Sequence, residues 1–495
     1  MRLSAFLNAR GAPRLRSIAT APTSAEARRS AAGAKAAPPR AITRFARRPS
    51  VLPRRAFRTV AAWPTVCVLV LVVSGGVAWA QPAKPNVVMI LVDDMGYADI
   101  GPYGAKDIRT PHLDRLRREG FKLTNFYSNG PVCTPTRAAF ITGRYQQRVG
   151  LEWAIVSKDH ESGLTTDQPS IAKLLKGNGY ATAIFGKWHL GYPTAFGPNA
   201  HGFDEFFGLK SGNHDFYSHL DSTGELDLYE QTGKVEKPGY TTDLITERSV
   251  DFIARHRTRP FFAYVAYNAP HWPFQPPDTP ADVRNAKTWT DGNRRTYGAM
   301  IERIDAGVGR LLAALDRHRL TRDTIVIFTN DNGGERYSDN APLFHHKATL
   351  WEGGIRVPCL IRWPARLDAG AASHVPAMTM DLTRTILAAT GTAPSSAHAP
   401  DGIDLLSLLE GRAKPVDRYL FWRIERTERR QKAVRFGAWK LVVDGNQNLL
   451  FNLEEDIAER RDRAFERPEL VRELRQRIEE WERELGASAP RFTVK

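Results

Sequence analysis

The sequence predicts an α/β protein: a large mixed, mostly parallel sheet, plus a smaller C-terminal subdomain with an antiparallel sheet and a helix. Two observations predict the main part. Short apolar runs rich in β-branched residues recur along the chain, and helical patterns separate them. After about residue 415 the apolar runs follow one another at short spacing, which is typical of an antiparallel meander. We therefore expect a leader over 1–80, a main domain over 81–414 and a C-terminal subdomain over 415–495.

The individual elements follow from local patterns. Five apolar runs have the length of buried strands: 87–92, 181–185, 261–267, 324–328 and 359–361. Helical patterns in the main domain begin at the Thr110 cap with Pro111 as first residue, and cover 170–175, 297–315 and 382–389. The expected C-terminal strands are 419–423, 432–436, 439–443 and 449–453, followed by a charged helix over Pro468–Leu485.

The positive charge of the chain is concentrated at its N-terminus. Residues 1–60 hold fourteen Lys or Arg and one acid, so they carry +13 of the net charge of +16. Because only +3 remains on the rest of the chain, the charge does not indicate a nucleic-acid-binding face. We expect no nucleic-acid partner.

Residues 1–80 have the features of a basic, disordered leader that ends in a signal peptide. Arg54 and Arg55 form a twin-arginine pair, an apolar stretch covers 61–73, and Ala78-Trp79-Ala80 is an A-x-A cleavage site. The alternative is an uncleaved membrane anchor, but the apolar stretch is short and interrupted by proline and glycine. We expect cleavage near Ala80, no stable membrane anchor afterwards, and a periplasmic or secreted location.

Four predicted strands run directly into clusters of polar residues. The clusters are Asp93-Asp94, Gly186-Lys187-Trp188-His189-Leu190-Gly191, Asn268-Ala269-Pro270-His271 and Thr329-Asn330-Asp331-Asn332-Gly333. In open α/β sheets, ligands bind beyond the carboxyl ends of the strands. A single cluster of this kind is commonly a turn, but four of them predict one site at this edge of the sheet.

Asp93, Asp94, Asp331 and Asn332 offer this site three carboxylates and an amide oxygen. Hard oxygen donors suit Ca²⁺ or Mg²⁺, whereas a zinc site more often holds several His or Cys residues. The alternative is that Asp93 caps a helix and that Asp331 forms a hydrogen bond within its own turn. Taken together, the four residues favour a metal site.

The sequence also supplies cationic and proton-transfer groups for such a site: Arg137, Lys187, His189, His271 and Lys347. A divalent metal with several such groups is suited to a compact anionic ester, either a sulfate or a phosphate. The alternatives are an ordinary surface position for Lys347 and a packed loop position for His271.

The three cysteines have different surroundings. Cys67 lies in the leader, and Cys359 lies in an apolar strand, where we expect an inert core residue. Cys133 lies between a strand-like stretch at 123–127 and a helical run at 137–141, near a helix N-terminus, where anions and reactive nucleophiles are favoured. A core cysteine and a bare catalytic thiolate are both alternatives for Cys133.

The sequence around Cys133 resembles the signature of the sulfatase family. Cys133-Thr134-Pro135-Thr136-Arg137, followed by Thr142-Gly143-Arg144, is similar to the C-x-P-x-R motif in which the cysteine is oxidised to formylglycine. The stretches Gly186 to Gly191, Asp93 to Tyr97 and His201 to Asp204 also resemble this family, and the similarity covers the chain from about Asn86 onward. The resemblance implies an alkaline-phosphatase-like α/β/α sandwich, and an enzyme of the arylsulfatase or N-acetylgalactosamine-6-sulfatase branch.

The resemblance also implies a role for each site residue. Asp93, Asp94, Asp331 and Asn332 would hold one Ca²⁺ together with the modified Cys133, whose hydrated aldehyde carries two hydroxyls.

One hydroxyl would attack sulfur while Arg137, Lys187 and Lys347 stabilise the charge on the sulfate oxygens. Asp331 would accept the proton of the attacking hydroxyl, and His271 with Lys347 would help the alcohol to leave. His189 would then deprotonate the second hydroxyl and so release sulfate.

This sequence departs from the family pattern at two positions. Thr136 stands where the family most often has serine, and we expect it to be tolerated because it keeps the hydroxyl. Asn330 stands where small residues are frequent, and we expect little consequence from it.

The implied partners are a formylglycine-generating enzyme for maturation and a small-molecule or glycan sulfate ester as substrate. The loop over 191–221 does not reveal the substrate, but Asn213, His214 and Asp215 in it are candidates to face that substrate. Two alternatives are a phosphate or phosphonate monoester hydrolase on the same scaffold and a non-catalytic binder of sulfated glycans.

Overall fold

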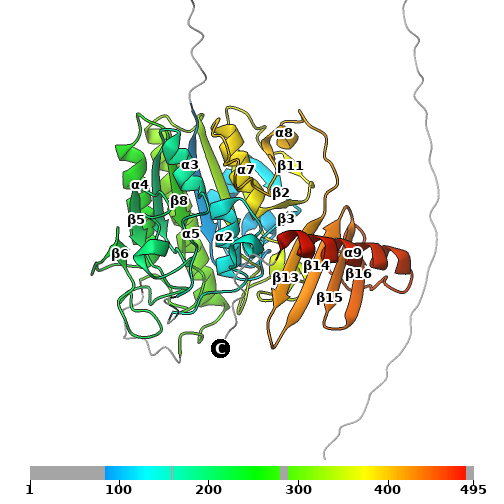
Figure 1. The fold of residues 1–495 in the computed structure, drawn as a ribbon. Coiled ribbons are helices and arrows are strands. Elements are labelled where there is room, and N and C mark those ends of the chain that lie inside the picture. Colours follow the sequence, from blue (N-terminus) through cyan, green and yellow to red (C-terminus); the bar gives the residue numbers. More distant parts are fainter. Residues whose placement is uncertain (1–83, 158, 160, 279–287, 487–495) are drawn as a thin grey trace, which may run out of the picture. The chain divides into compact units, whose positions relative to one another are not determined.

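The computed structural model describes residues 84–157, 159, 161–278 and 288–486 (Figure 1). The predicted leader over 1–80 lies outside these residues. Within the part of the chain that is described, no helix combines the length and the apolar character that a membrane crossing requires.

The larger of the two main sheets is parallel at its centre and has antiparallel strand pairs on both sides of that centre. Its strand order is β11-β2-β10-β9-β1-β8-β4-β5-β6-β7, and β9, β1, β8, β4 and β5 run parallel to one another. The strands are β1 Asn86–Val92, β2 Phe121–Leu123, β4 Ala181–Gly186, β5 Glu205–Gly208, β6 Tyr229–Glu230, β7 Gly233–Lys234, β8 Phe261–Ala266, β9 Thr324–Asn330, β10 Cys359–Arg362 and β11 Ala372–Ser373. The prediction of a mixed, mostly parallel sheet is confirmed.

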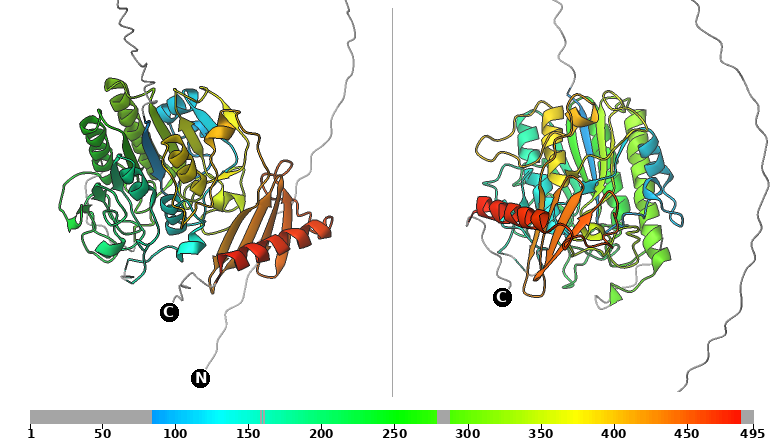
Figure 2. Two further views of the ribbon diagram at one scale, coloured as in Figure 1. Left: turned by 45° about the horizontal axis from the view of Figure 1, so that its top comes forward. Right: turned by 90° about the vertical axis from the view of Figure 1, so that its right-hand side faces the viewer.

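Helices cover both faces of this sheet (Figure 2). Alternate residues of β1 enter two separate hydrophobic cores: Val88, Ile90 and Val92 pack with α1, α4 and α5, and the residues between them pack with α2, α3 and α7. Such two-sided burial explains why the strand reads as an unbroken apolar run. The helices are α1 Pro111–Arg118, α2 Cys133–Thr142, α3 Ile171–Gly177, α4 Thr241–Arg255, α5 Arg294–Arg317, α6 Glu352–Ile355, α7 Thr379–Ala389 and α8 Leu406–Leu409.

Most predicted elements are found within a few residues of their expected ends. One detail is wrong: the Thr110 side chain does not cap α1, because its hydroxyl accepts a hydrogen bond from the Gly101 N–H at 2.8 Å. The strand-like stretch at 123–127 forms the end of β2 and the separate strand β3, Phe126–Tyr127, which pairs with β12, Ala377–Met378. Helix α4 was not predicted, although its apolar residues Leu244, Ile245, Phe252 and Ile253 recur at helical spacing.

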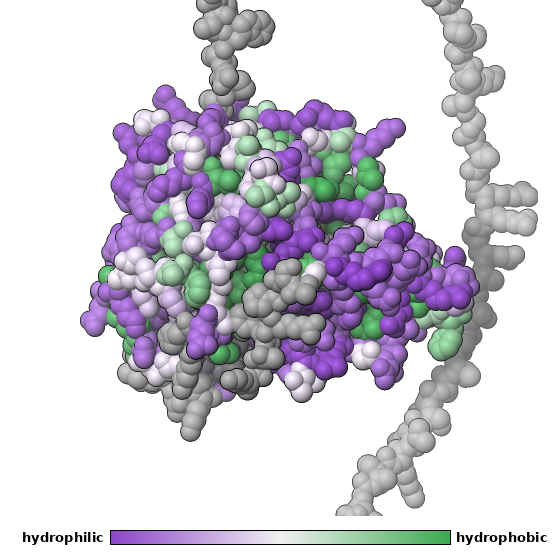
Figure 3. Space-filling view, viewed as in Figure 1, coloured by the Kyte–Doolittle hydropathy of each residue, from purple (hydrophilic) through white to green (hydrophobic). Residues whose placement is uncertain are grey.

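The C-terminal part forms a four-stranded antiparallel sheet, as predicted. Its strands are β13 Leu420–Glu425, β14 Arg430–Phe436, β15 Trp439–Asp444 and β16 Gln447–Asn452, paired in that order. Helix α9, Pro468–Leu485, packs on one face through Val471, Leu474 and Ile478. The outer side of α9 is strongly hydrophilic (Figure 3). The domain boundary at 414/415 stays a prediction.

The other face of this sheet packs against the main domain, and this contact contains a buried group of charges. Lys440 on β15 contacts two buried carboxylates, with Nζ 2.8 Å from Glu352 Oε1 and 2.9 Å from Glu459 Oε1. Glu352 also accepts hydrogen bonds from Tyr127 Oη at 2.7 Å and from Arg356 Nη1 at 3.1 Å. Burial opposes the charge on Glu352, but Lys440 and the nearby arginines outweigh it and lower the pKa of Glu352 to about 2.

We predict that Lys440→Met lowers the free energy of unfolding by about 3–5 kcal/mol, because it leaves buried carboxylates without their shared cation. Denaturant unfolding measures the change. The matched control is Lys432→Met on β14, whose Nζ pairs with Glu482 at 2.7 Å in a partly exposed position. The control should cost less than about 1 kcal/mol. Equal losses in the two variants would contradict the assigned role of Lys440.

Candidate active site

The four predicted polar clusters lie together beyond the carboxyl ends of the central strands. Asp93 and Asp94 follow β1, and Asp331 follows β9, the parallel neighbour of β1. Backbone hydrogen bonds tie the strand ends to one another: the Asp331 N–H donates to Val92 at 3.1 Å, and the Asp93 N–H donates to Ala269 at 3.2 Å. Neither Asp93 nor Asp94 begins a helix, which removes the helix-cap alternative for Asp93.

The chain turns sharply at this edge. Asp94 has φ 65°, a left-handed conformation that few non-glycine residues adopt. Asn330 holds the turn in place, because its side chain donates to the Met95 carbonyl at 2.6 Å and accepts from the Met95 N–H at 3.3 Å. The expectation that Asn330 has little consequence is therefore wrong: its buried carboxamide joins the Asp93-Asp94 turn to the end of β9.

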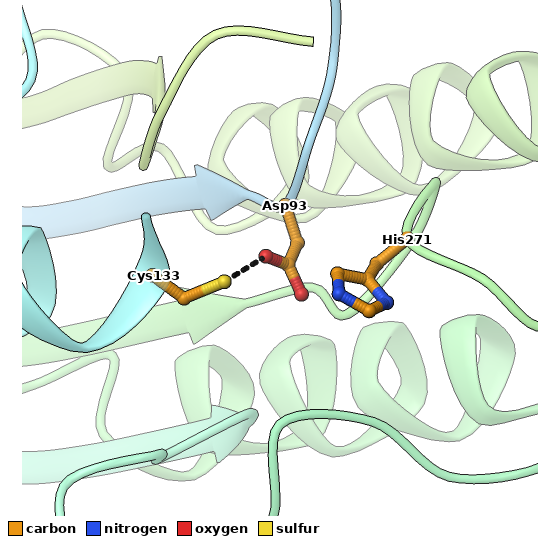
Figure 4. Close-up of side chains that lie close together, drawn as sticks. All are labelled: Asp93, Cys133 and His271. Carbon is orange, nitrogen blue, oxygen red and sulfur yellow. Dashed lines mark hydrogen bonds between the residues drawn. The ribbon is translucent and has the colours of Figure 1, made fainter. Parts of the chain in front are cut away.

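Cys133 is the first residue of α2, and its side chain points toward the end of β1 (Figure 4). Its Sγ lies 3.2 Å from Asp93 Oδ1, and the residue is only 2% exposed. Burial, and then the Asp93 charge, raise the pKa of the Cys133 thiol well above its ordinary value. The unmodified side chain is thus a neutral thiol, which argues against the bare thiolate as a nucleophile.

The rest of the Cys133 motif fixes α2 to its surroundings. The Thr136 hydroxyl accepts from the Gly130 N–H at 3.0 Å and donates to the Gly130 carbonyl at 3.1 Å, so the threonine serves the turn as a serine would. The Thr134 hydroxyl donates to the His189 carbonyl at 2.9 Å. These contacts fasten the start of α2 to the cluster that follows β4.

Two cations are fully buried among the carboxylates. Arg137 Nη2 and Nε lie 2.8 and 3.0 Å from Asp331 Oδ2, and Lys187 Nζ lies 2.6 Å from Asp93 Oδ2. Asp331 therefore pairs with another element, and the alternative of a hydrogen bond within its own turn does not apply. Burial, and then the Asp93 charge, raise the pKa of Asp331.

A second group of contacts surrounds Asp94. Lys347 Nζ lies 2.5 Å from Asp94 Oδ2, and His271 Nε2 lies 3.3 Å from the same oxygen. Although burial opposes it, the Lys347 charge and then His271 lower the pKa of Asp94. Lys347 is thus part of the cluster and does not occupy an ordinary surface position.

His189 is held in one orientation with one nitrogen free. Its Nε2 lies 2.8 Å from the Ile155 carbonyl, which requires a proton on Nε2. Nδ1 then carries the lone pair, and it has no hydrogen-bond partner among the described residues. Burial, and then the Lys187 charge, lower the pKa of His189 well below its ordinary value, so the ring is neutral and Nδ1 keeps its lone pair.

The acidic residues fit a bound divalent cation. Ligand atoms of Asp93, Asp94, Cys133 and Asp331 all lie within 4.8 Å of one another. Asp331 Oδ1 and Asn332 Oδ1 are buried and have no hydrogen-bond partner within the described part of the chain. Buried oxygens left unpaired are costly, and a hard cation would satisfy both of them.

The structure differs from the sequence expectations on one loop. His214 is buried, and its ring nitrogens face the Asp227 carbonyl at 3.1 Å and the Thr241 hydroxyl at 2.9 Å. Asp215 is buried as well and accepts from Gln275 Nε2 at 2.6 Å. These two side chains are buried and bond to the protein around the loop, whereas Asn213 reaches the Trp272 carbonyl at 3.1 Å, beside His271.

Two neighbours of the cluster were not singled out from the sequence. Glu335 Oε2 lies 3.5 Å from Lys347 Nζ, and Asn268 is buried with neither amide atom paired within the described residues. Asn268 lies in a strand-end cluster, which was a usable signal. Glu335 gave no such signal, because the path of the loop after Asn332 is not encoded in a local pattern.

Comparisons with known protein families, sequences and structures all point to sulfatases. The sulfatase family profile matches residues 85–392. Human N-acetylgalactosamine-6-sulfatase is 36% identical over 376 residues, which cover 70% of this chain and 69% of that protein. Mouse steryl-sulfatase is 33% identical over 437 residues and covers 71% and 69%. Among solved structures, Ps i-CgsB in complex with k-i-k-neocarrahexaose has a TM-score of 0.77 at 31% identity, covering 83% of this chain and 95% of that one.

We predict that Ca²⁺ raises the melting temperature of the protein, because a ligand that binds only the folded state stabilises it by about 2.7 kcal/mol at 100 times its Kd. Calorimetry with Ca²⁺ and with a chelator measures the shift. Asp331→Asn should reduce the shift, whereas Asp251→Asn, on the exposed side of α4, should keep it. A wild-type melting temperature that does not respond to Ca²⁺ would exclude the site.

Proposed function

The chain belongs to the sulfatase family, and from that premise we propose that it hydrolyses a carbohydrate or aryl sulfate monoester with formylglycine at position 133 and one bound Ca²⁺. One observation carries the proposal: Cys133 starts a buried helix, and its side chain points into a cluster of acids and cations. As a neutral, buried thiol it is a poor nucleophile, so an oxidised form accounts better for its position.

The charges in the cluster support an anionic substrate. Each of three carboxylates contacts a cation: Asp331 contacts Arg137, Asp93 contacts Lys187, and Asp94 contacts Lys347. The net charge of these six side chains is therefore close to zero. Bound Ca²⁺ would supply a positive surplus that attracts a sulfate ester and polarises its oxygens. Asp93, Asp94, Asp331 and Asn332 would hold the ion.

The protein groups around the reacting atoms have distinct roles in this proposal. Arg137 and Lys187 are fixed by carboxylates and add positive charge next to position 133, where they oppose the charge that develops on the sulfate oxygens. Lys347 is only 14% exposed and is held by Asp94 at 2.5 Å. Lys347 and His271 would support the departure of the alcohol.

His189 has the properties of a general base. The bond to Ile155 fixes its tautomer, and Nδ1 keeps a free lone pair in a buried position. Oxidised and hydrated, position 133 would present two hydroxyls, one as the nucleophile and one whose deprotonation expels sulfate. We assign that proton to His189.

The similar proteins favour a sulfated carbohydrate as the substrate. They include an N-acetylgalactosamine-6-sulfatase and a structure that contains k-i-k-neocarrahexaose, although a steryl-sulfatase is similar as well. The phosphatase alternative has less support. A two-metal phosphatase needs a second ligand group, and the candidate metal groups within the described residues all share Asp93 and Cys133.

We predict that Cys133→Ala lowers kcat on an aryl sulfate at least about a thousandfold, as loss of a nucleophile does in other enzymes. Cys359→Ala is the matched control, because Cys359 is buried in the apolar core and belongs to no candidate metal group among the described residues. Mass spectrometry of the peptide spanning position 133 should show CHO in place of CH₂SH. An unmodified thiol in active protein, or faster turnover of the matching aryl phosphate, would overturn the proposal.

We also predict that the oxidation acts before the chain folds. All ten residues of α2 are buried, so a maturation enzyme cannot reach Cys133 in the folded protein. A formylglycine-generating enzyme should convert a peptide spanning the motif and leave folded, unmodified protein unchanged, as intact mass would report. Conversion of the folded protein at the rate of the peptide would contradict this order.

A further inference from the structure

Two cavities lie beside the loop that connects Asp331 and Asn332, the candidate metal ligands after β9, to Lys347. The larger, of about 500 Å³, has Arg460 and His346 in its wall, and the smaller, of about 330 Å³, has Arg429 and Arg430. His345 lines both cavities, and we call the two cavities together the depression. Neither cavity is lined by a residue with a proposed catalytic role.

The larger cavity borders the candidate active site. Glu335 forms part of its wall, and Glu335 Oε2 lies 3.5 Å from Lys347 Nζ, which in turn contacts Asp94. A substrate with its sulfate next to Cys133 and its alcohol portion near Lys347 is therefore directed toward this cavity. A single sugar or aryl group does not need two further cavities, whereas an oligosaccharide extends into them.

The loop between the cavities is firmly held. The Lys347 N–H donates to the Gly334 carbonyl at 3.1 Å, and the Ala348 N–H donates to the Pro131 carbonyl at 2.8 Å, two residues before Cys133. His345 has φ 63°, and its ring stacks on Trp351 with the centroids 5.8 Å apart. These contacts fix the position of the depression relative to Cys133.

The arginines at the depression are not neutralised by carboxylates. Arg429 Nη1 donates to the Ala348 carbonyl at 2.7 Å, and Arg460 lies over the Phe344 ring, 4.3 Å from its centroid. Within the described residues, neither these two arginines nor Arg430 forms an ion pair, and all three are exposed.

The acids that line the depression have other partners. Glu428 pairs with Arg426, Glu335 lies beside Lys347, and Asp444 accepts from Gln431 Nε2 at 2.7 Å. The guanidinium groups of the three arginines are therefore available to a ligand. Guanidinium groups form paired hydrogen bonds with sulfate and carboxylate oxygens, which makes them suited to a second anionic group.

We propose that Arg429, Arg430, Arg460 and His345 form an anion subsite that binds a second sulfate or carboxylate on a neighbouring sugar of the same substrate. The subsite rests on the proposed function, because it assigns the substrate to the class of multiply anionic oligosaccharides. It lies partly on the C-terminal sheet, which supplies Arg429 and Arg430 from the turn before and the start of β14.

The test compares three tetrasaccharides of galactose and hexosamine: one with a single sulfate, one with two sulfates on adjacent sugars, and one with a sulfate and a carboxylate. The wild-type enzyme should have a higher kcat/KM on the doubly charged compounds. In Arg430→Gln/Arg460→Gln, the ratio of kcat/KM for doubly to singly charged substrates should fall about tenfold or more, mainly through KM. The comparison of the two doubly charged compounds identifies which anion the subsite prefers.

Arg461→Gln is the matched control, because this exposed neighbour of Arg460 lines neither cavity and should leave the ratio unchanged. A loss of folded protein would lower the rates on all three compounds together and would leave the ratio unaltered, whereas a general effect of charge would also lower the ratio in Arg461→Gln. A wild-type enzyme that does not discriminate between the compounds, or an unaltered ratio in the double variant, would overturn the subsite.

Calorimetric binding in a Cys133→Ala background separates this proposal from the catalytic one. The doubly charged tetrasaccharides should bind at least tenfold more weakly after the two arginine substitutions, whether or not the wild-type protein hydrolyses sulfate. Binding that depends on the arginines without hydrolysis would contradict only the catalytic proposal. Hydrolysis without binding that depends on the arginines would contradict only the subsite.

Discussion

The candidate active site depends on the burial of three carboxylates at neighbouring strand ends. Parallel strands bring Asp93, Asp94 and Asp331 to one edge of the sheet, where all three are at most 3% exposed. Burying a carboxylate without a partner costs several kcal/mol of folding free energy. Each of the three carboxylates therefore needs a cation from a neighbouring element. Arg137 comes from α2, Lys187 from the end of β4, and Lys347 from the loop after β9. Compensation of charge thus joins three segments that are distant in sequence.

Helix α2 shows how this constraint shapes the sequence motif. Arg137, one turn after the start of α2, pairs with Asp331, and that pairing sets where Cys133 lies. Thr134 reaches the His189 carbonyl and Thr136 closes the turn at Gly130, so the two hydroxyls fix the same end of the helix. The motif therefore has a structural role in the folded protein in addition to any role in directing oxidation. This second role explains why a hydroxyl suffices at position 136, whether it belongs to serine or to threonine.

The sequence predicts the centre of the fold better than its edges. A strand buried on both faces, such as β1, needs apolar residues at every position, and this local requirement is visible in the sequence. The direction of β10 is not visible in the sequence, because its pairing with β9 and β2 is decided by residues far away in the chain. The strand-end clusters could be found in the same way as β1, because polar residues directly after an apolar run are a local signal in the sequence. His214 was misinterpreted because a polar loop residue looks the same in sequence whether it faces solvent or a buried carbonyl.

The C-terminal sheet is coupled to the candidate site through the segment between Lys347 and α6. Gln431 accepts from the Leu350 N–H at 3.0 Å, and Lys440 holds Glu352 at the start of α6. Helix α6 packs against the turn after β9, because the Gly333 N–H donates to Gly354 at 2.9 Å, and a Cβ at Gly333 would lie 1.8 Å from the Gly353 oxygen. Only glycine permits this approach. The position of Lys347 is therefore set from both ends, by β9 and by the C-terminal sheet. A subdomain that looks like an appendage in the sequence thus helps to position a cation of the candidate site, and its arginines line the two cavities beside that site.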